Sequence, residues 1–183
     1  MFSAPKAPFF NWGAHVEFPA IPVDEFTSYL NARFAAHGLT LPDDVSQTLQ
    51  VAMQRNPEAI NRISAEIVRH MGSRTDVKSI ARITWTDVEE AISSVVGSRR
   101  SAAEEYLRRF SPGEERVMVA MAKMGGSVVE PMGKEFVHTC RLSTGGMRKI
   151  VGWLEDEAAI YRDGKSYLLA DPLIRLHLAA YRL

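Results

Sequence analysis

Five cations in the C-terminal third of the chain are the residues whose chemistry stands out. They are Arg141, Arg148, Lys149, Arg162 and Lys165. Guanidinium and ammonium groups bind phosphate oxygens, and an arginine or lysine on a helix can also bind base edges in the major groove of DNA. These residues therefore indicate a nucleic-acid-binding surface, provided that the fold presents them to solvent.

The charges around these cations leave a second interpretation open. Glu155, Asp156 and Glu157 follow Lys149 closely and repel phosphate, and the whole chain has a formal net charge of zero and a pI near 7.0. Trp153, in the same stretch, could anchor a protein interface, although a tryptophan beside an apolar stripe is more often partly buried. The sequence thus predicts either a DNA partner or a protein partner.

Catalytic and metal-binding patterns are missing from the sequence. No Gly-rich phosphate loop is followed by Lys-Ser/Thr, so we expect this chain to lack Walker A and Walker B elements and not to be an enzyme. Cys140 and His138 would point to different faces of a helix, which argues against a cysteine nucleophile. The five histidines lack metal-ligand spacing, so we expect no metal and no cofactor and interpret each histidine as a surface or capping residue: His15, His37, His70, His138 and His177.

The segment that carries the cations, residues 111–183, has the element order of a winged helix-turn-helix domain. Ser111, Pro112 and Glu114 provide an N-cap, a first helical residue and a capping box. A short β-prone run at 127–129 follows, then a second helix that opens at Pro131 and a third helix after a turn at 142–145. This third helix would be the one that enters a DNA groove.

The end of the chain supplies the wing of such a domain. Asp163-Gly164 lies between two β-prone runs, which is a strong hairpin signal. Asp171-Pro172 then begins a last helix, which must pack on a core because it is too short to be stable alone. The hairpin would carry Arg162 and Lys165.

Upstream of this domain, residues 19–97 have the pattern of a small helical bundle. Apolar residues recur at helical spacing over 24–37, 42–56 and 57–72, and a fourth helix begins at Thr84 or Thr86, where Thr86 and Glu89 have capping-box spacing. Residues 98–110 are interpreted as a linker helix with few core positions, whose arginines can pair with Glu104 and Glu105. Residues 1–18, rich in proline and aromatic residues, are expected to form an extended arm.

The predicted fold class is therefore mainly α, with an N-terminal helical bundle followed by a winged helix-turn-helix domain with a small β-hairpin wing. With 46% hydrophobic residues the chain can fill a core, and its single cysteine suggests a reducing compartment. No stretch has the length and composition of a signal peptide or a membrane span. We accordingly expect a cytoplasmic protein with no membrane contact.

With these elements assigned, the chain resembles the C-terminal portion of archaeal-type AAA+ and STAND ATPases, in which a helical lid precedes a winged helix. The stretches that carry the resemblance are residues 7–10, 18–26, 29–34, 38–39 and 55–57 for the strand exit and lid, and 111–116 and 167–175 for the winged helix. The sequence Asp171-Pro172-Leu173 is typical of the end of that family's winged helix.

The resemblance implies a non-catalytic module of such an ATPase, whose core would be supplied by sequence outside this chain. Arg55 stands where the family usually has glycine, and Glu58 stands where a sensor arginine would be sought, so the lid is not expected to act on nucleotide. The module would bind DNA or protein through its winged helix. The alternative is a stand-alone winged-helix transcription regulator whose N-terminal bundle forms a homodimer.

Overall fold

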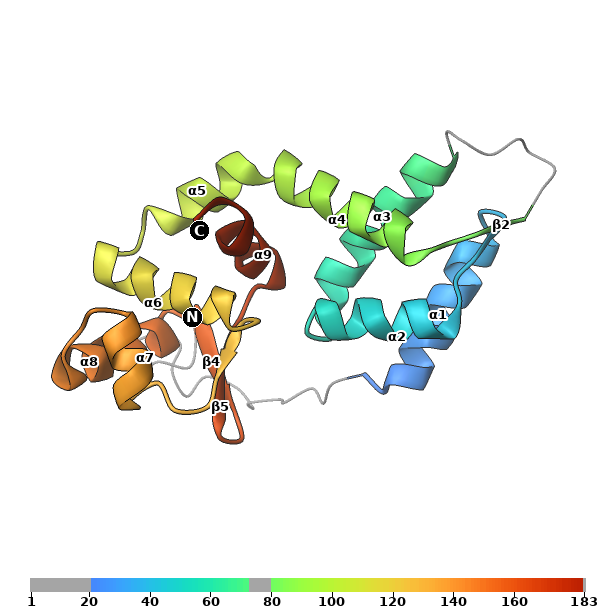
Figure 1. Cartoon of the computed structure of the whole chain (residues 1–183). Coiled ribbons are helices and arrows are strands. Elements are labelled where there is room, and N and C mark those ends of the chain that lie inside the picture. The colour runs from blue at the N-terminus through green and yellow to red at the C-terminus, as the bar shows by residue number, and fades with distance from the viewer. Residues whose placement is uncertain (1–20, 73–79, 183) are drawn as a thin grey trace, which may run out of the picture. The chain divides into compact units, whose positions relative to one another are not determined.

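The computed structural model describes residues 21–72 and 80–182 (Figure 1). The chain divides into two compact units between Arg100 and Ser101, which we call the helical unit (21–100) and the C-terminal unit (101–182). The predicted arm at 1–18 and the predicted loop at 73–79 lie outside the described residues.

The helical unit contains four helices and a short parallel strand pair in its described part. The helices are α1 (Val23–Ala35), α2 (Asp43–Ala52), α3 (Pro57–Gly72) and α4 (Trp85–Ser98), and the strands are β1 (Leu39–Thr40) and β2 (Ala81–Arg82). The strand pair was not predicted, because two-residue strands have no periodicity to detect. The helices follow the predicted segments closely.

The start of α4 corrects one sequence prediction. The capping box is formed by Thr84 and Asp87, not by Thr86 and Glu89: the Asp87 N–H donates to Thr84 Oγ1, and the Thr84 N–H donates to Asp87 Oδ2 at 2.8 Å. Both pairs have the same spacing. Thr84 is the cap because β2 ends just before it and Trp85 already begins the helix.

The helical unit has a polar cluster within its apolar interior. The Gln50 amide donates to Thr27 Oγ1 at 2.8 Å, and the Thr27 and Ser46 hydroxyls are 3.1 Å apart. All three residues are buried, and they connect α1 to α2. Mutual hydrogen bonding satisfies these groups, which would otherwise be costly to bury.

The C-terminal unit contains five helices and a three-stranded sheet among its described residues. The helices are α5 (Arg100–Leu107, beginning at the unit boundary), α6 (Pro112–Lys123), α7 (Lys134–Thr139), α8 (Thr144–Asp156) and α9 (Pro172–Tyr181), and the strands are β3 (Ser127–Val128), β4 (Ile160–Asp163) and β5 (Ser166–Leu169). The antiparallel sheet has the order β3-β5-β4. Figure 1 shows the β4–β5 hairpin extending from the helices of this unit.

This order of helices and strands is winged-helix-like, and the predicted fold class is confirmed. Its caps are those that the sequence indicates: Ser111 and Glu114 form a capping box at α6, and Asp171 caps α9 by accepting from the N–H groups of Leu173 and Ile174. The predicted hairpin forms, with Asp163 paired to Ser166 and the turn at Gly164 and Lys165. A single apolar core joins these elements.

Two expectations for this unit differ from the structure. The second helix does not open at Pro131, because residues 130–133 form a turn in which the Gly133 N–H donates to the Glu130 carbonyl at 2.9 Å, and α7 begins only at Lys134. In the segment 98–110, predicted to be a linker helix with few core positions, three side chains are buried in the C-terminal core: Ala103, Leu107 and Phe110.

Candidate nucleic-acid interface

Helix α8 presents two of the five predicted cations to solvent. The Ser143 hydroxyl caps the helix by accepting from the Gly146 N–H at 3.1 Å. Met147, Val151 and Leu154 are buried at helical spacing, so this side of α8 faces the core and the opposite side faces solvent. Arg148 and Lys149 are exposed, and no ion pair occupies either charge among the described residues.

The acidic residues lie at the other end of α8. Glu155 and Asp156 are exposed, whereas Glu157 is engaged by Arg109, whose Nη2 lies 2.8 Å from Glu157 Oε2. Seven helical steps separate Arg148 from Glu155, which is about 10 Å along the axis. This distance is close to the Debye length at roughly 0.1 M salt. Dissolved ions therefore weaken the effect of the acidic residues on the potential around Arg148 and Lys149.

The hairpin presents the cations Arg162 and Lys165 next in the chain. Both are exposed, and α8 packs on β4, the strand that contains Arg162. The Arg162 Nε donates to the Gly164 carbonyl at 3.0 Å, and its guanidinium lies 5.9 Å from the ring centre of Tyr167. These contacts hold Arg162 on the hairpin and leave other guanidinium donors for a ligand.

Arg141 belongs to a different surface from the other four predicted cations. It lies in the turn between α7 and α8 and lines a hollow formed by α6 and the end of α7. No residue of α8 or of the hairpin lines this hollow. The structure therefore exposes Arg148 and Lys149 on α8 and Arg162 and Lys165 on the hairpin, whereas Arg141 lines the hollow beside α6.

One histidine was wrongly predicted to be a surface or capping residue. The side chain of His177, on α9, is only 1% exposed, and its Nε2 lies 3.1 Å from Oε1 of Glu104 on α5. Arg182 also binds Glu104 at 2.6 Å and binds Glu115 of α6 at 2.8 Å. This network joins three helices, and its residues are too far apart in the chain for a sequence pattern to reveal it.

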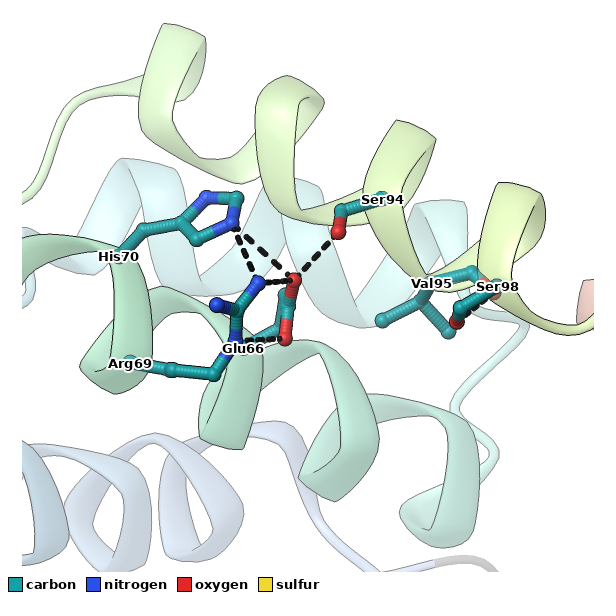
Figure 2. Close-up of polar contacts among 6 residues, drawn as sticks. All are labelled: Glu66, Arg69, His70, Ser94, Val95 and Ser98. Carbon is teal, nitrogen blue, oxygen red and sulfur yellow. Dashed lines mark hydrogen bonds and ion pairs between the residues drawn. The ribbon is translucent and has the colours of Figure 1, made fainter.

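A second network, in the helical unit, joins α3 to α4 (Figure 2). Glu66 accepts hydrogen bonds from Arg69 Nη2 at 2.6 Å and from Ser94 Oγ at 2.5 Å, and His70 Nε2 lies 3.1 Å away. Hydrogen bonds from Arg69 and then Ser94 lower the pKa of Glu66 to about 2. The spacing of Glu66, Arg69 and His70 on one helix could have predicted their interaction from the sequence. No local pattern could have predicted that Ser94, on another helix, joins them.

The remaining chemical candidate, Cys140, is buried. Burial raises the pKa of its thiol to about 11, so it is a neutral thiol near pH 7 and a poor nucleophile. Across residues 21–72 and 80–182, no three His, Cys, Asp or Glu side chains gather where they could hold a metal ion. Within the same residues, no helix combines the length and apolar character needed to cross a bilayer.

Comparison with known proteins gives one informative likeness, and it is structural. No protein-family model matches the chain, and no curated protein does. The fold is similar to that of a Walker-type ATPase of Pyrococcus abyssi, with a TM-score of 0.62 and 16% sequence identity. The match covers 87% of this chain and 42% of that one, so this chain spans less than half the length of its structural neighbour. The chain thus has the fold of part of a Walker-type ATPase.

Proposed function

We propose that this chain is a non-catalytic module of an AAA+/STAND-type ATPase and that it binds duplex DNA through α8 and the β4–β5 hairpin. The helical unit would correspond to the lid and the C-terminal unit to the winged helix of that family, and the ATPase core would lie outside these 183 residues. The fold likeness to a Walker-type ATPase and the lack of a Walker A sequence in the chain support this assignment.

The observation that carries the DNA proposal is the unpaired cationic surface of α8. Arg148 and Lys149 lie in its N-terminal half, which is the part of a recognition helix that reaches base edges. Arg162 and Lys165, both exposed on the hairpin, would bind phosphates of the same duplex. The ion pair of Glu157 with Arg109 removes one of the three acids that argued against DNA.

The test is a titration of labelled duplex DNA at several salt concentrations between about 50 and 200 mM. We expect the affinity to fall steeply with salt, and the double variant Arg148→Ala with Lys149→Ala to bind roughly tenfold or more weakly with a salt slope smaller by about 2. A matched control removes two exposed arginines of the helical unit, Arg33→Ala with Arg62→Ala. No binding at low salt, or an equal loss in the control, would reject the proposal.

Protein docking through α8 is the second candidate, and exposed aromatic residues favour it. Trp153 is 47% exposed and Tyr161 on β4 is 41% exposed. Exposed aromatic residues are typical anchors of protein interfaces. Sedimentation velocity of the wild type and Trp153→Ala, with a second copy of this chain as the partner, tests it: concentration-dependent association that the variant loses supports docking, and monomers throughout contradict self-docking.

A further inference from the structure

A second basic surface lies on α6, apart from the proposed DNA interface. It is a hollow of about 500 Å³ between α6, the end of α7 and Arg182. Arg116, Lys123, Arg141 and Arg182 line it with a single acidic residue, Glu115. The surroundings of the hollow therefore have an excess of three positive charges in a chain whose net charge is zero.

Among the residues that the structure describes, three of these four cations have no counter-ion. Arg182 is held by Glu115 and Glu104, at 2.8 and 2.6 Å. In the described part of the chain, the charged groups of Arg116, Lys123 and Arg141 form neither ion pairs nor hydrogen bonds, and all three side chains are exposed. Since Arg182 already neutralises Glu115, the free charge at the hollow is positive.

The backbone conformation of Arg141 positions its side chain at this surface. Its φ of 53° is in the left-handed region, where glycine is favoured and a side chain is strained. The position follows the C-cap of α7: the Arg141 N–H donates to the His138 carbonyl and the Leu142 N–H to the Val137 carbonyl. This helix-ending turn brings the Arg141 guanidinium to the hollow.

The floor of the hollow is apolar. Val119 and Ala120 of α6 lie between the cations, and Arg116 and Lys123 are seven residues apart, about 10 Å along the helix. Phosphate groups are polar and do not pack on an apolar floor. An extended peptide with carboxylates flanking an apolar side chain matches both features. The apolar side chain would pack on the floor, and the carboxylates would bind the cations, because arginine binds carboxylates through paired hydrogen bonds.

We propose that this hollow is a docking site for an acidic, partly apolar peptide segment of a protein partner, held by Arg116, Lys123 and Arg141 around the floor of Val119 and Ala120. The site does not depend on the proposed binding of DNA by α8. It would let the C-terminal unit bind a protein on one surface while another surface remains available.

The probe is a short fluorescein-labelled peptide in which Asp and Glu alternate with Leu, compared with its Asn and Gln counterpart, on the full chain. We expect the acidic peptide to bind and the amide peptide to bind at least roughly tenfold more weakly. Arg116→Gln with Lys123→Gln should weaken the acidic peptide by a similar factor, whereas Arg33→Gln with Arg62→Gln, which removes two positive charges from the helical unit, should not.

Arg141→Gly keeps the test independent of folding. Glycine suits the left-handed backbone at this position, so the variant should fold at least as well as the wild type while losing peptide affinity severalfold. Equal binding of the acidic and amide peptides, or wild-type affinity in Arg141→Gly, would overturn the proposal. Loss of duplex DNA binding in Arg141→Gly without any change in peptide binding would also overturn the proposal, because Arg141 would then bind DNA phosphates and not the peptide.

Discussion

The two units hold their helices together with different kinds of charged network. In the helical unit, Glu66 is bound by Arg69 and His70 of its own helix, and only Ser94 comes from another helix. In the C-terminal unit, the network of Glu104 and Arg182 joins three helices, and every one of its ion pairs crosses between elements.

Comparing the two networks shows which ion pairs contribute to tertiary structure and which stabilise a single helix. Arg69 is 65% exposed and would find Glu66 in an isolated helix, so most of that interaction belongs to α3 alone. His177 is buried beside Glu104, and its Nδ1 has no hydrogen-bond partner in the part of the chain that the structure describes. Loss of the C-terminal network should therefore lower the stability of its unit more than loss of the Glu66 network lowers that of the helical unit.

Glu104→Ala should give the largest effect. It leaves His177 Nε2 buried without an acceptor and frees one end of Arg182, so we expect the free energy of unfolding to fall by about 2–3 kcal/mol. Urea unfolding measures it. Glu105→Ala, which removes a 77% exposed carboxylate paired with Arg108, is the control and should change stability by less than about 0.5 kcal/mol. Equal losses would remove the distinction between the two networks.

Glu66→Gln should have a smaller and pH-dependent effect. The folded pKa of about 2 is below the ordinary value of 4.5, so the carboxylate stabilises the fold above pH 4.5 and loses this contribution as the pH falls toward 2. We expect Glu66→Gln to lower the free energy of unfolding by about 1 kcal/mol at neutral pH, since Arg69 is mostly exposed. Unfolding of wild type and variant should converge in acid; a gap that persists at pH 2 would contradict the charge-based origin. Glu58→Gln, whose partner is the exposed Arg62, is the control.

The caps offer a comparison of neighbouring threonines. Thr84→Ala should destabilise the helical unit by about 1 kcal/mol, because the Asp87 N–H loses its acceptor at the start of α4. Thr86→Ala, inside the first turn, should change the urea midpoint little. If Thr86→Ala were the more destabilising variant, the capping box would be formed by Thr86 and Glu89, as their spacing in the sequence suggested.

Arg141→Gly should produce the smallest effect and the opposite sign. Relief of the left-handed strain at φ 53° should stabilise the C-terminal unit by up to about 1 kcal/mol, offset by the greater flexibility of glycine in the unfolded chain. Arg148→Gly, in the interior of α8, should instead destabilise by about 1 kcal/mol. Thermal unfolding of both variants measures whether each change raises or lowers stability. A destabilised Arg141→Gly would mean that the arginine side chain supports the fold.

Short-range signals in the sequence determined most of the elements of this protein. Apolar spacing predicted the extent of α3, the Ser111–Glu114 box predicted the start of α6, and Asp163-Gly164 predicted the hairpin. These signals work because caps, turns and helix faces depend on residues within a few positions of one another. The five candidate cations could be named for the same reason, from their type and local spacing.

Tertiary structure alone decided which of these residues share a surface. It buried His177 against Glu104, 73 residues away, and paired Arg109 with Glu157, 48 residues away. It also separated Arg141 from Arg148 and grouped it with Arg116 and Lys123 of α6. Such groupings follow from how helices pack across an apolar core, and local spacing contains no information about which charged faces that packing brings together.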